Sequence, residues 1–148
     1  MKKILMITEK DYDDSEVLYP YYRLIEAGYP VDVAASEKGE VSGKYHFKIN
    51  AGFSFAEINP YDYAGLILPG GKAPERIRQF ESVCKLISEF NRLQKPIAAI
   101  CHGQQLLISA GVLKGKRATC YPGIRDDLKN AGAIYEDSCV VICDYLVT

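Results

Sequence analysis

Histidine is scarce in this chain of 148 residues, which contains only His46 and His102. A papain-like protease needs a histidine well downstream of its cysteine, and a glutamine amidotransferase triad has the same requirement. No histidine follows His102, so the sequence excludes both mechanisms for Cys101. Any chemistry in which a histidine assists a thiol must use one of these two side chains.

Long apolar runs are also missing. The longest is far shorter than the roughly 20 residues that a membrane-spanning helix needs. Residues 1–8 contain too brief an apolar stretch for a signal peptide and predict a first β-strand instead. The five cysteines show no paired spacing, which favours a reducing cytoplasm over a disulfide framework. We therefore expect a cytoplasmic protein that does not contact the membrane.

Neither sign of charge dominates, since 18 Lys and Arg residues face 19 Asp and Glu residues and the net charge is −1. The interspersed charges exclude a basic nucleic-acid surface and a polybasic membrane anchor. Cys139 and Cys143 form a poor zinc motif because no histidine lies near them. We expect both thiols in the core of a Val- and Ile-rich strand, and we expect no metal and no cofactor.

The chain has no linker, repeat or low-complexity segment, and 48% of its residues are hydrophobic. Residues 1–148 are therefore predicted to form a single domain. Strands and helices alternate, which predicts an α/β layered fold. Strands are expected at about 3–8, 31–35, 63–69, 97–100, 134–136 and 139–147, a short hairpin at 37–50, and helices at about 14–27, 80–93, 103–110 and 122–131. Pro20 should kink the first helix or delay its regular part.

Cys101 lies between a predicted buried strand and a predicted buried helix that ends at Gly111. A nucleophile on a sharp strand-to-helix turn is the architecture of a nucleophile elbow. The positive end of the helix should lower the pKa of the thiol from ~8.5 to between roughly 4 and 7. The alternative is a structural cysteine buried in the strand. Gly103, which has no side chain to block close approach, favours the reactive interpretation.

Several polar groups are predicted near Cys101. His102 follows it directly and needs an acid to orient its ring, whereas His46 is expected to be an ordinary exposed residue of the hairpin. Four acidic residues follow the first strand, namely Asp11, Asp13, Asp14 and Glu16. Because parallel strands bring their carboxyl ends to one edge of the sheet, these acids are expected at the same edge as Cys101. Most of them are expected to interact with the dipole of the following helix, and one is expected to belong to the site.

Gly70 and Gly71 follow the strand at 63–69, and Glu75 comes shortly after them. The backbone N–H groups of the two glycines and of His102 can form an oxyanion hole that faces Cys101. A Gly-Gly pair alone is a weak signal, and it gains meaning only beside the elbow.

These residues resemble the ThiJ/PfpI superfamily, and specifically its PfpI-type intracellular protease branch. The matching segments occur in family order over nearly the whole chain. They are Glu16-Val17-Leu18-Tyr19-Pro20, residues 68–76 with Gly70-Gly71, Ala99-Ile100-Cys101-His102-Gly103, residues 109–115, and Tyr121-Pro122-Gly123-Ile124-Arg125-Asp126-Asp127. The resemblance implies a flavodoxin-like three-layer sandwich with a mostly parallel central sheet.

The resemblance also implies roles for individual residues. Cys101 would be the nucleophile beside His102, and Glu16 would hydrogen-bond the sulfur. Glu75 would reach His102 from a neighbouring subunit, which requires a homo-oligomer, from dimer to hexamer. Asp13 and Tyr121 would surround these groups. Family activities comprise peptidase, glutathione-independent glyoxalase and deglycase reactions, so the substrate would be a small molecule or a peptide.

The chain departs from the family pattern at three places. Asp13 stands where the branch usually has Glu, and Gln104 stands where Pro is frequent, a change from which we expect little effect. The chain ends at Thr148, before the segment that normally carries a terminal helix. We therefore expect the C-terminal family helix to be absent.

The sequence thus predicts a cysteine-dependent hydrolase of the PfpI type. Cys101 would attack the substrate, His102 oriented by Glu75 would transfer the proton, the amides of Gly71 and His102 would bind the oxyanion, and Glu16 would tune the thiol. The alternative is a non-enzymatic redox sensor or stress-protective protein in which Glu16 holds oxidised Cys101. An amidotransferase-like binding domain is a less favoured third possibility. Pocket shape decides between peptide and aldehyde substrates.

Overall fold

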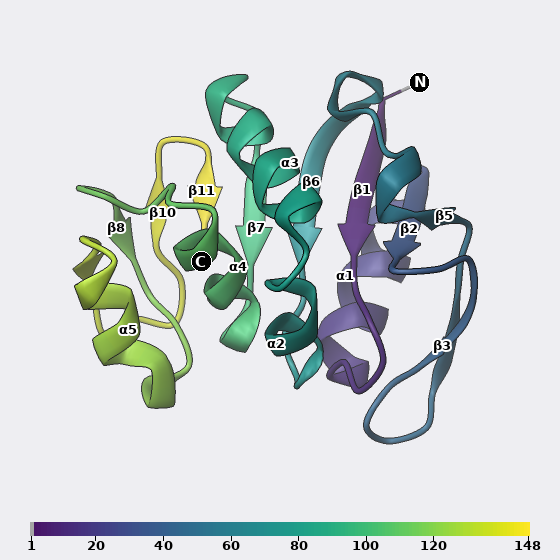
Figure 1. Ribbon diagram of the computed structural model, residues 1–148, viewed down its shortest axis with the longest axis horizontal. Coiled ribbons are helices and arrows are strands. Elements are labelled where there is room, and N and C mark those ends of the chain that lie inside the picture. The colour runs from purple at the N-terminus through teal and green to yellow at the C-terminus, as the bar shows by residue number, and fades with distance from the viewer. Residues whose placement is uncertain (1) are drawn as a thin grey trace.

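A seven-stranded sheet forms the centre of the computed structural model, which describes residues 2–148 (Figure 1). The strand order is β10-β11-β7-β6-β1-β2-β5. All neighbours pair in parallel except β10 and β11. The strands are β1 (Lys3–Ile7), β2 (Val31–Ala35), β5 (Phe53–Ser54), β6 (Tyr63–Leu68), β7 (Ile97–Ala99), β10 (Ile142–Cys143) and β11 (Leu146–Val147). The order of β2, β1, β6, β7 and β11 is that of a flavodoxin-like sheet.

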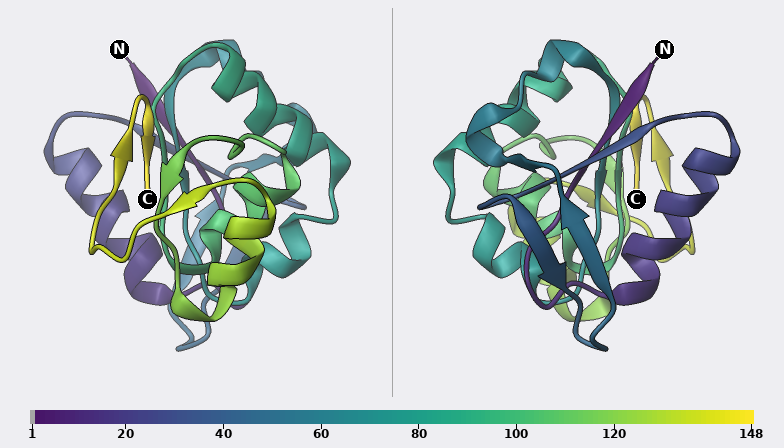
Figure 2. Two further views of the ribbon diagram at one scale, coloured as in Figure 1. Left: turned by 90° about the vertical axis from the view of Figure 1, so that its left-hand side faces the viewer. Right: turned by 90° about the vertical axis from the view of Figure 1, so that its right-hand side faces the viewer.

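Helices cover both faces of this sheet (Figure 2). Helix α1 (Asp14–Glu26) lies on one face, and four helices lie on the other. These four are α2 (Ala73–Ile77), α3 (Glu81–Arg92), α4 (Gln104–Ser109) and α5 (Arg125–Asn130). None of the helices that the structure describes is both long and apolar enough to cross a bilayer. The predicted α/β sandwich with a mostly parallel sheet is confirmed.

Shorter elements complete the chain. Strands β3 (Gly39–Ser42) and β4 (Lys48–Ala51) form the predicted hairpin, and β8 (Arg117–Ala118) pairs with β9 (Ile134–Tyr135). Single 3-10 turns are η1 (Phe55–Glu57), η2 (Pro60–Asp62), η3 (Cys101–Gly103) and η4 (Pro122–Ile124). The turn η3 matters most for function because it contains the predicted nucleophile.

The core explains why the long elements were predictable. Leu5, Met6 and Ile7 of β1 are fully buried, as expected for a strand covered on both faces. Helix α3 buries one face, at the spacing of three to four residues that amphipathic helices show. That face consists of Val83, Leu86, Ile87 and Phe90.

Helix α1 begins where it does because Asp13 caps it. The Asp13 carboxylate accepts hydrogen bonds from the backbone N–H groups of Ser15 and Glu16, which would otherwise lack partners at a helix start. The neighbouring carboxylate of Asp14 accepts from the backbone N–H groups of Tyr45 and Phe47 in the β3–β4 hairpin. The Asp13 cap and the Asp14 bonds to the hairpin together fix the first turn of α1, which contains Glu16.

Two sequence predictions about regular structure need correction. Of the two effects expected of Pro20, the delayed start is wrong, because helix α1 starts at Asp14 and continues through the proline, which removes only one N–H donor. The expected strand at 139–147 is instead two short strands joined by a turn in which Asp144 has a φ of 55°. Cys139 is exposed and Cys143 is half-buried, so neither thiol belongs to the core.

Candidate active site

The predicted site residues gather at one edge of the sheet. Strands β1, β6 and β7 are parallel neighbours, so their carboxyl ends point the same way (Figure 1). The loops after them contain residues 8–13, Pro69–Lys72 and the turn η3. In sheets of this topology, ligands bind at the carboxyl edge near the point where strand order reverses. The expectation that acids after the first strand share an edge with Cys101 is therefore correct.

Cys101 occupies a strained elbow. Its φ of 60° lies in the left-handed region, which non-glycine residues adopt rarely. The turn also approaches β6 very closely, because a Cβ atom at Gly103 would lie 2.1 Å from the carbonyl oxygen of Leu68. Only glycine fits there. Strand β7, the turn η3 and helix α4 follow one another directly, as the predicted elbow requires.

The sulfur of Cys101 has partners on several sides. His102 Nδ1 lies 3.2 Å from Sγ. The Glu16 carboxyl group and the backbone N–H groups of His102 and Gly71 lie close enough to the sulfur to shift the pKa of the thiol. Glu16 Oε2 accepts a further hydrogen bond of 2.8 Å from the backbone N–H of Gly70. Donors and acceptors from α1, the glycine loop and the elbow thus converge on one atom.

Gly70 makes this convergence possible. A Cβ atom at position 70 would lie 2.5 Å from Glu16 Oε2 and 2.9 Å from both Cys101 Cβ and the backbone nitrogen of His102. A methyl group there would separate the carboxylate from the thiol. Contact between Glu16 and Cys101 therefore depends on a missing side chain in the loop after β6.

We expect Gly70→Ala to fold but to lose about 90–99% of its turnover, because misplacement of reacting groups by about 1 Å costs rates of this order. The midpoint of Cys101 alkylation against pH should move as well, since the Glu16 contact is broken. Gly52→Ala is the matched control, as nothing lies within 4 Å of a Cβ atom at position 52. Unchanged turnover in Gly70→Ala would show that the contact is dispensable.

Burial and the neighbouring Glu16 carboxylate raise the pKa of Cys101 to about 11. The predicted depression is wrong because burial and the Glu16 charge outweigh the two backbone N–H groups that face the sulfur. Burial also raises the pKa of Glu16, and the nearby Asp13 charge adds to this effect. Because the pKa of the thiol lies well above neutral pH, a base must accept its proton when the sulfur attacks.

The ring of His102 is held from the side by Tyr121. The two rings stack with centroids 4.6 Å apart and an interplanar angle of 28°. The backbone N–H of Tyr121 donates to the carbonyl of Cys101 at 3.3 Å. Among residues 2–148, the hydrogen bonds of the imidazole involve Nδ1 alone. The Nε2 edge is therefore the edge that an orienting carboxylate would contact.

Glu75 and Asp13 lie apart from the sulfur. Glu75 is an exposed residue of α2, and within the described part of the protomer its carboxylate does not contact His102. Asp13 caps α1 and pairs with Lys44 Nζ at 2.6 Å. His46 is exposed at the hairpin turn, as predicted. The structure thus brings together Cys101, His102, Glu16, Gly71 and Tyr121, with Asp13 next to Glu16, and it leaves Glu75 outside this group.

Sequence reasoning missed the bracing of the glycine loop. An isolated antiparallel bridge joins Tyr12 to Gly71, with hydrogen bonds from Asp13 N to Gly70 O at 3.3 Å and from Lys72 N to Asp11 O at 2.9 Å. Gly71 has a φ of 80°, and a Cβ atom there would lie 2.3 Å from the nitrogen of Asp13. No local sequence pattern predicts this bridge, because it joins segments that are far apart in the chain.

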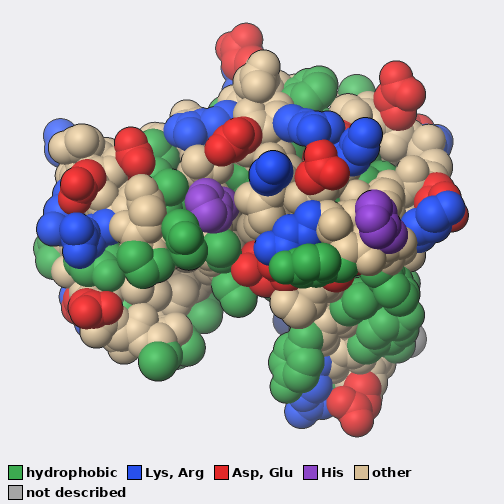
Figure 3. Space-filling view, turned by 90° about the horizontal axis from the view of Figure 1, so that it is seen from below, with side chains coloured by type: hydrophobic (Ala, Val, Ile, Leu, Met, Phe, Trp, Pro, Cys, Tyr) green, Lys and Arg blue, Asp and Glu red, His purple; other side chains and the backbone are tan. Residues whose placement is uncertain are grey.

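Figure 3 shows the molecule from this edge, with both histidines visible among mixed charges and a notch on the α1 side. A groove of about 510 Å³ lies there, next to Glu16, and its lining is mostly apolar. Its lining residues include Tyr19, Pro20, Ile67, Ala98, Ile100 and Val147. Among residues 2–148, no group of three His, Cys, Asp or Glu side chains is placed to hold a metal ion.

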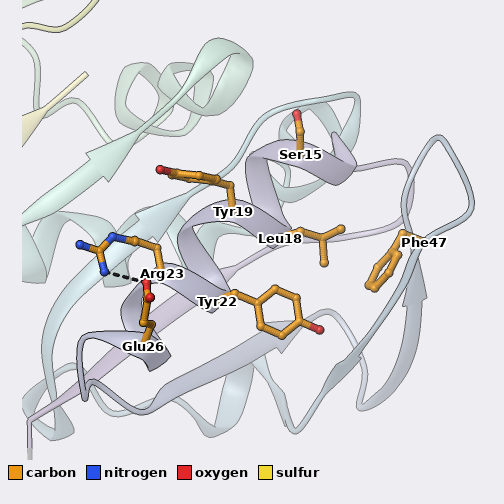
Figure 4. A pocket seen from close by; sticks show the side chains of 7 residues that line it. All are labelled: Ser15, Leu18, Tyr19, Tyr22, Arg23, Glu26 and Phe47. Carbon is orange, nitrogen blue, oxygen red and sulfur yellow. Dashed lines mark hydrogen bonds and ion pairs between the residues drawn. The ribbon is translucent and has the colours of Figure 1, made fainter.

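A second hollow, of about 650 Å³, lies between α1 and the hairpin turn (Figure 4). Tyr19, Tyr22 and Phe47 line it, and Arg23 pairs with Glu26 at its rim. None of the residues that surround the sulfur lines this hollow. The chemistry therefore belongs to the sheet edge, although the larger hollow is elsewhere.

The fold and the site define a class of α/β proteins that carry a cysteine elbow at the carboxyl edge of a parallel sheet. Residues 2–148 match the DJ-1/PfpI family, and the chain belongs to that family. The chain is 46% identical over 140 residues to Deglycase PfpI of Pyrococcus furiosus, covering 95% of this chain and 84% of the relative. It is 39% identical over 150 residues to General stress protein 18 of Bacillus subtilis, covering 99% and 87%.

Solved structures agree with this assignment. A two-domain protein from Anabaena variabilis, with a DJ-1/ThiJ/PfpI-like and a ferritin-like domain, superposes with a TM-score of 0.98 at 32% identity. The match covers all of this chain and 43% of that protein, so the chain spans less than half of it. DJ-1 of Schizosaccharomyces pombe superposes with a TM-score of 0.88 at 26% identity, covering 99% of this chain and 82% of that one.

Proposed function

We propose that this protein is a cysteine-dependent hydrolase of the PfpI type whose substrates are small reactive carbonyl compounds or their adducts, peptides, or both. The observation that carries the proposal is the placement of Cys101 Sγ, at a strained elbow and 3.2 Å from His102 Nδ1. The deglycase name of the Pyrococcus furiosus relative supports carbonyl adducts as the substrate class.

In the first chemical step the Cys101 sulfur attacks the carbonyl carbon of the substrate. A C–S bond forms, the carbonyl π bond becomes an alkoxide, and the thiol proton passes to His102 Nδ1 or to Glu16. The N–H groups of Gly71 and His102, which face the sulfur, then donate to the new oxyanion. With a peptide, the tetrahedral adduct expels the amine, which takes up the proton held by His102 or Glu16, and water then hydrolyses the thioester and restores the thiol. With an α-oxo aldehyde, the hydrogen of the attacked carbon moves as a proton to the neighbouring carbonyl carbon, and water hydrolyses the resulting thioester to a hydroxy acid and the free thiol.

The decisive experiment compares steady-state turnover of methylglyoxal with that of a fluorogenic peptide. Cysteine-dependent turnover of either substrate, lost in Cys101→Ser, supports the proposal, and the ratio of the two kcat/KM values assigns the preferred class. Turnover of neither substrate by folded protein would contradict it.

Glu75 completes the proposed triad from a neighbouring subunit of a homo-oligomer. Its exposed carboxylate has no contact with His102 of its own protomer among the described residues, while a histidine base needs an orienting partner. The exposed aromatic side chains of Tyr19, Tyr22 and Tyr45 support association, because clustered apolar surface marks contact sites.

We expect two inactive variants, Cys101→Ser and Glu75→Ala, to regain activity when they are mixed and allowed to exchange subunits. Some sites would then combine an intact Cys101 with an intact Glu75 from the partner. Dilution to monomers should abolish turnover while circular dichroism stays unchanged. A fully active monomer, verified by light scattering at assay concentration, would contradict the shared site.

The redox-sensor alternative is favoured by one observation. Glu16, whose pKa is raised by burial, lies beside the sulfur, and in its protonated form it can donate to a sulfinate oxygen. All five cysteines are free, which supports a reducing cytoplasm as the place of action. Peroxide-dependent sulfinic acid at Cys101, found by mass spectrometry in protein without turnover, would favour this alternative over the hydrolase.

A further inference from the structure

Gln104, the first residue of α4, makes hydrogen bonds that the proposed mechanism does not use. Its side chain is 1% exposed. Nε2 donates to the carbonyl of Ala99 at 3.0 Å and to the carbonyl of Thr119 at 3.0 Å. A primary amide has two N–H donors, and both are engaged. The side chain therefore connects the end of β7 to the segment that follows β8.

The orientation of this amide is fixed by its partners. Exchange of its oxygen and nitrogen would place Oε1 against two carbonyl oxygens, which cannot donate. In the observed orientation Oε1 is buried and has no partner among residues 2–148. An unpaired buried acceptor opposes folding. A polar side chain held in the interior in this way is a poor choice for stability alone.

The segment that Gln104 holds leads directly to the imidazole. Thr119 is two residues before Tyr121, whose ring stacks on His102. The segment makes three further hydrogen bonds, from the Thr119 N–H to Thr148 Oγ1 at 2.9 Å, from the Ile124 N–H to the Tyr121 carbonyl at 3.0 Å, and from the Tyr121 N–H to the Cys101 carbonyl at 3.3 Å. The last of these bonds is long, since N–H···O bonds usually measure about 2.9–3.0 Å. The Gln104 amide is thus the side-chain tie between the elbow helix and the Tyr121 segment.

We propose that Gln104 is a positioning residue that sets the orientation of His102 by holding the Thr119–Tyr121 segment against the elbow. The chain of contacts runs from the Gln104 amide to the Thr119 carbonyl, then to the Tyr121 ring and the His102 ring. The inference rests on the proposed function for its catalytic consequence, but the orientation of His102 is measurable without any substrate.

The two-histidine composition makes the test simple. The proton NMR spectrum contains one Hε1 signal each from His46 and His102, and His46→Gln assigns them. Tyr121→Leu removes the ring that stacks on His102 and defines the shift of an unstacked imidazole. Gln104→Met removes both hydrogen bonds with little change in volume. Gln105→Met is the matched control, because Gln105 is the next buried glutamine and its Oε1 has no hydrogen-bond partner among residues 2–148.

We expect the His102 Hε1 signal of Gln104→Met to move at least halfway towards that of Tyr121→Leu, with the Gln105→Met signal at the wild-type position. In the turnover assay kcat should fall about tenfold while KM stays within about threefold, as loss of alignment predicts. If Gln104→Met does not fold, Gln104→Asn, whose shorter amide cannot span both carbonyls, is measured in the same way.

An unmoved His102 signal in a folded Gln104 variant would overturn the inference. Equal displacement in Gln104→Met and Gln105→Met would also overturn it, because it would reflect general repacking of α4. The NMR result is independent of activity. A displaced signal in an enzyme without hydrolytic turnover would therefore sustain the positioning role while the proposed function failed.

Discussion

Cys101→Ser should fold like the wild type and lose at least about a thousandfold in kcat for any substrate that the protein turns over, the order of loss that removal of a nucleophile causes. A serine hydroxyl at this elbow keeps a similar shape, but it is a much weaker nucleophile because its proton is harder to remove. The change leaves Glu16 and the Gly71 N–H in place. The loss should therefore appear in kcat and kcat/KM together.

Cys139→Ser is the matched control for this prediction, because Cys139 is an exposed cysteine that is not among the groups acting on the Cys101 sulfur. Both variants are compared by thermal unfolding and by steady-state kinetics. Retention of more than a tenth of the wild-type kcat in Cys101→Ser would show that the thiol is not the nucleophile. Equal loss in Cys139→Ser would point to a general effect of cysteine removal.

Gly103→Ala should have the largest effect on stability. Its methyl group would lie 2.1 Å from the Leu68 carbonyl oxygen, which belongs to the backbone of a central strand and cannot move aside. We expect a loss of about 3 kcal/mol or more in the free energy of unfolding, or no folded protein. Urea unfolding followed by circular dichroism measures this loss.

Gly52→Ala is the control for that experiment as well. Position 52 has open space around a Cβ atom, so the substitution should change stability by less than about 1 kcal/mol. A Gly103→Ala variant as stable as Gly52→Ala would mean that the elbow and β6 are separated more widely than the structure shows.

The parts of the fold that could be predicted from sequence are those with a local pattern. The apolar runs of β1 and β6 and the amphipathic spacing of α3 belong to elements long enough to show a period. The strand, turn and helix around Cys101 are consecutive in the chain, so the elbow is predictable too. Two-residue strands such as β5 and β8 have no period of their own and were not predicted.

The sequence did not predict the raised pKa of Cys101 or the hydrogen bonds of Gln104, and both have the same physical cause. The pKa of Cys101 depends on burial and on the charge of Glu16, which is distant in sequence. The backbone N–H groups of His102 and Gly71 lower this pKa, and they are the smaller influences. The role of Gln104 likewise depends on the carbonyl of Thr119, 15 residues away. Local sequence identifies the reactive atom, and tertiary contacts decide how its charge and its neighbours are arranged.

The partners of the sulfur come from opposite layers of the sandwich. Glu16 belongs to α1 on one face of the sheet, whereas Cys101 precedes α4 on the other face. Any stress that loosens α1 from the sheet therefore removes the carboxylate before it unwinds a strand. The alkylation rate of Cys101 should therefore report how tightly α1 packs against the sheet. In mild denaturant it should change ahead of the far-ultraviolet signal of the folded protein.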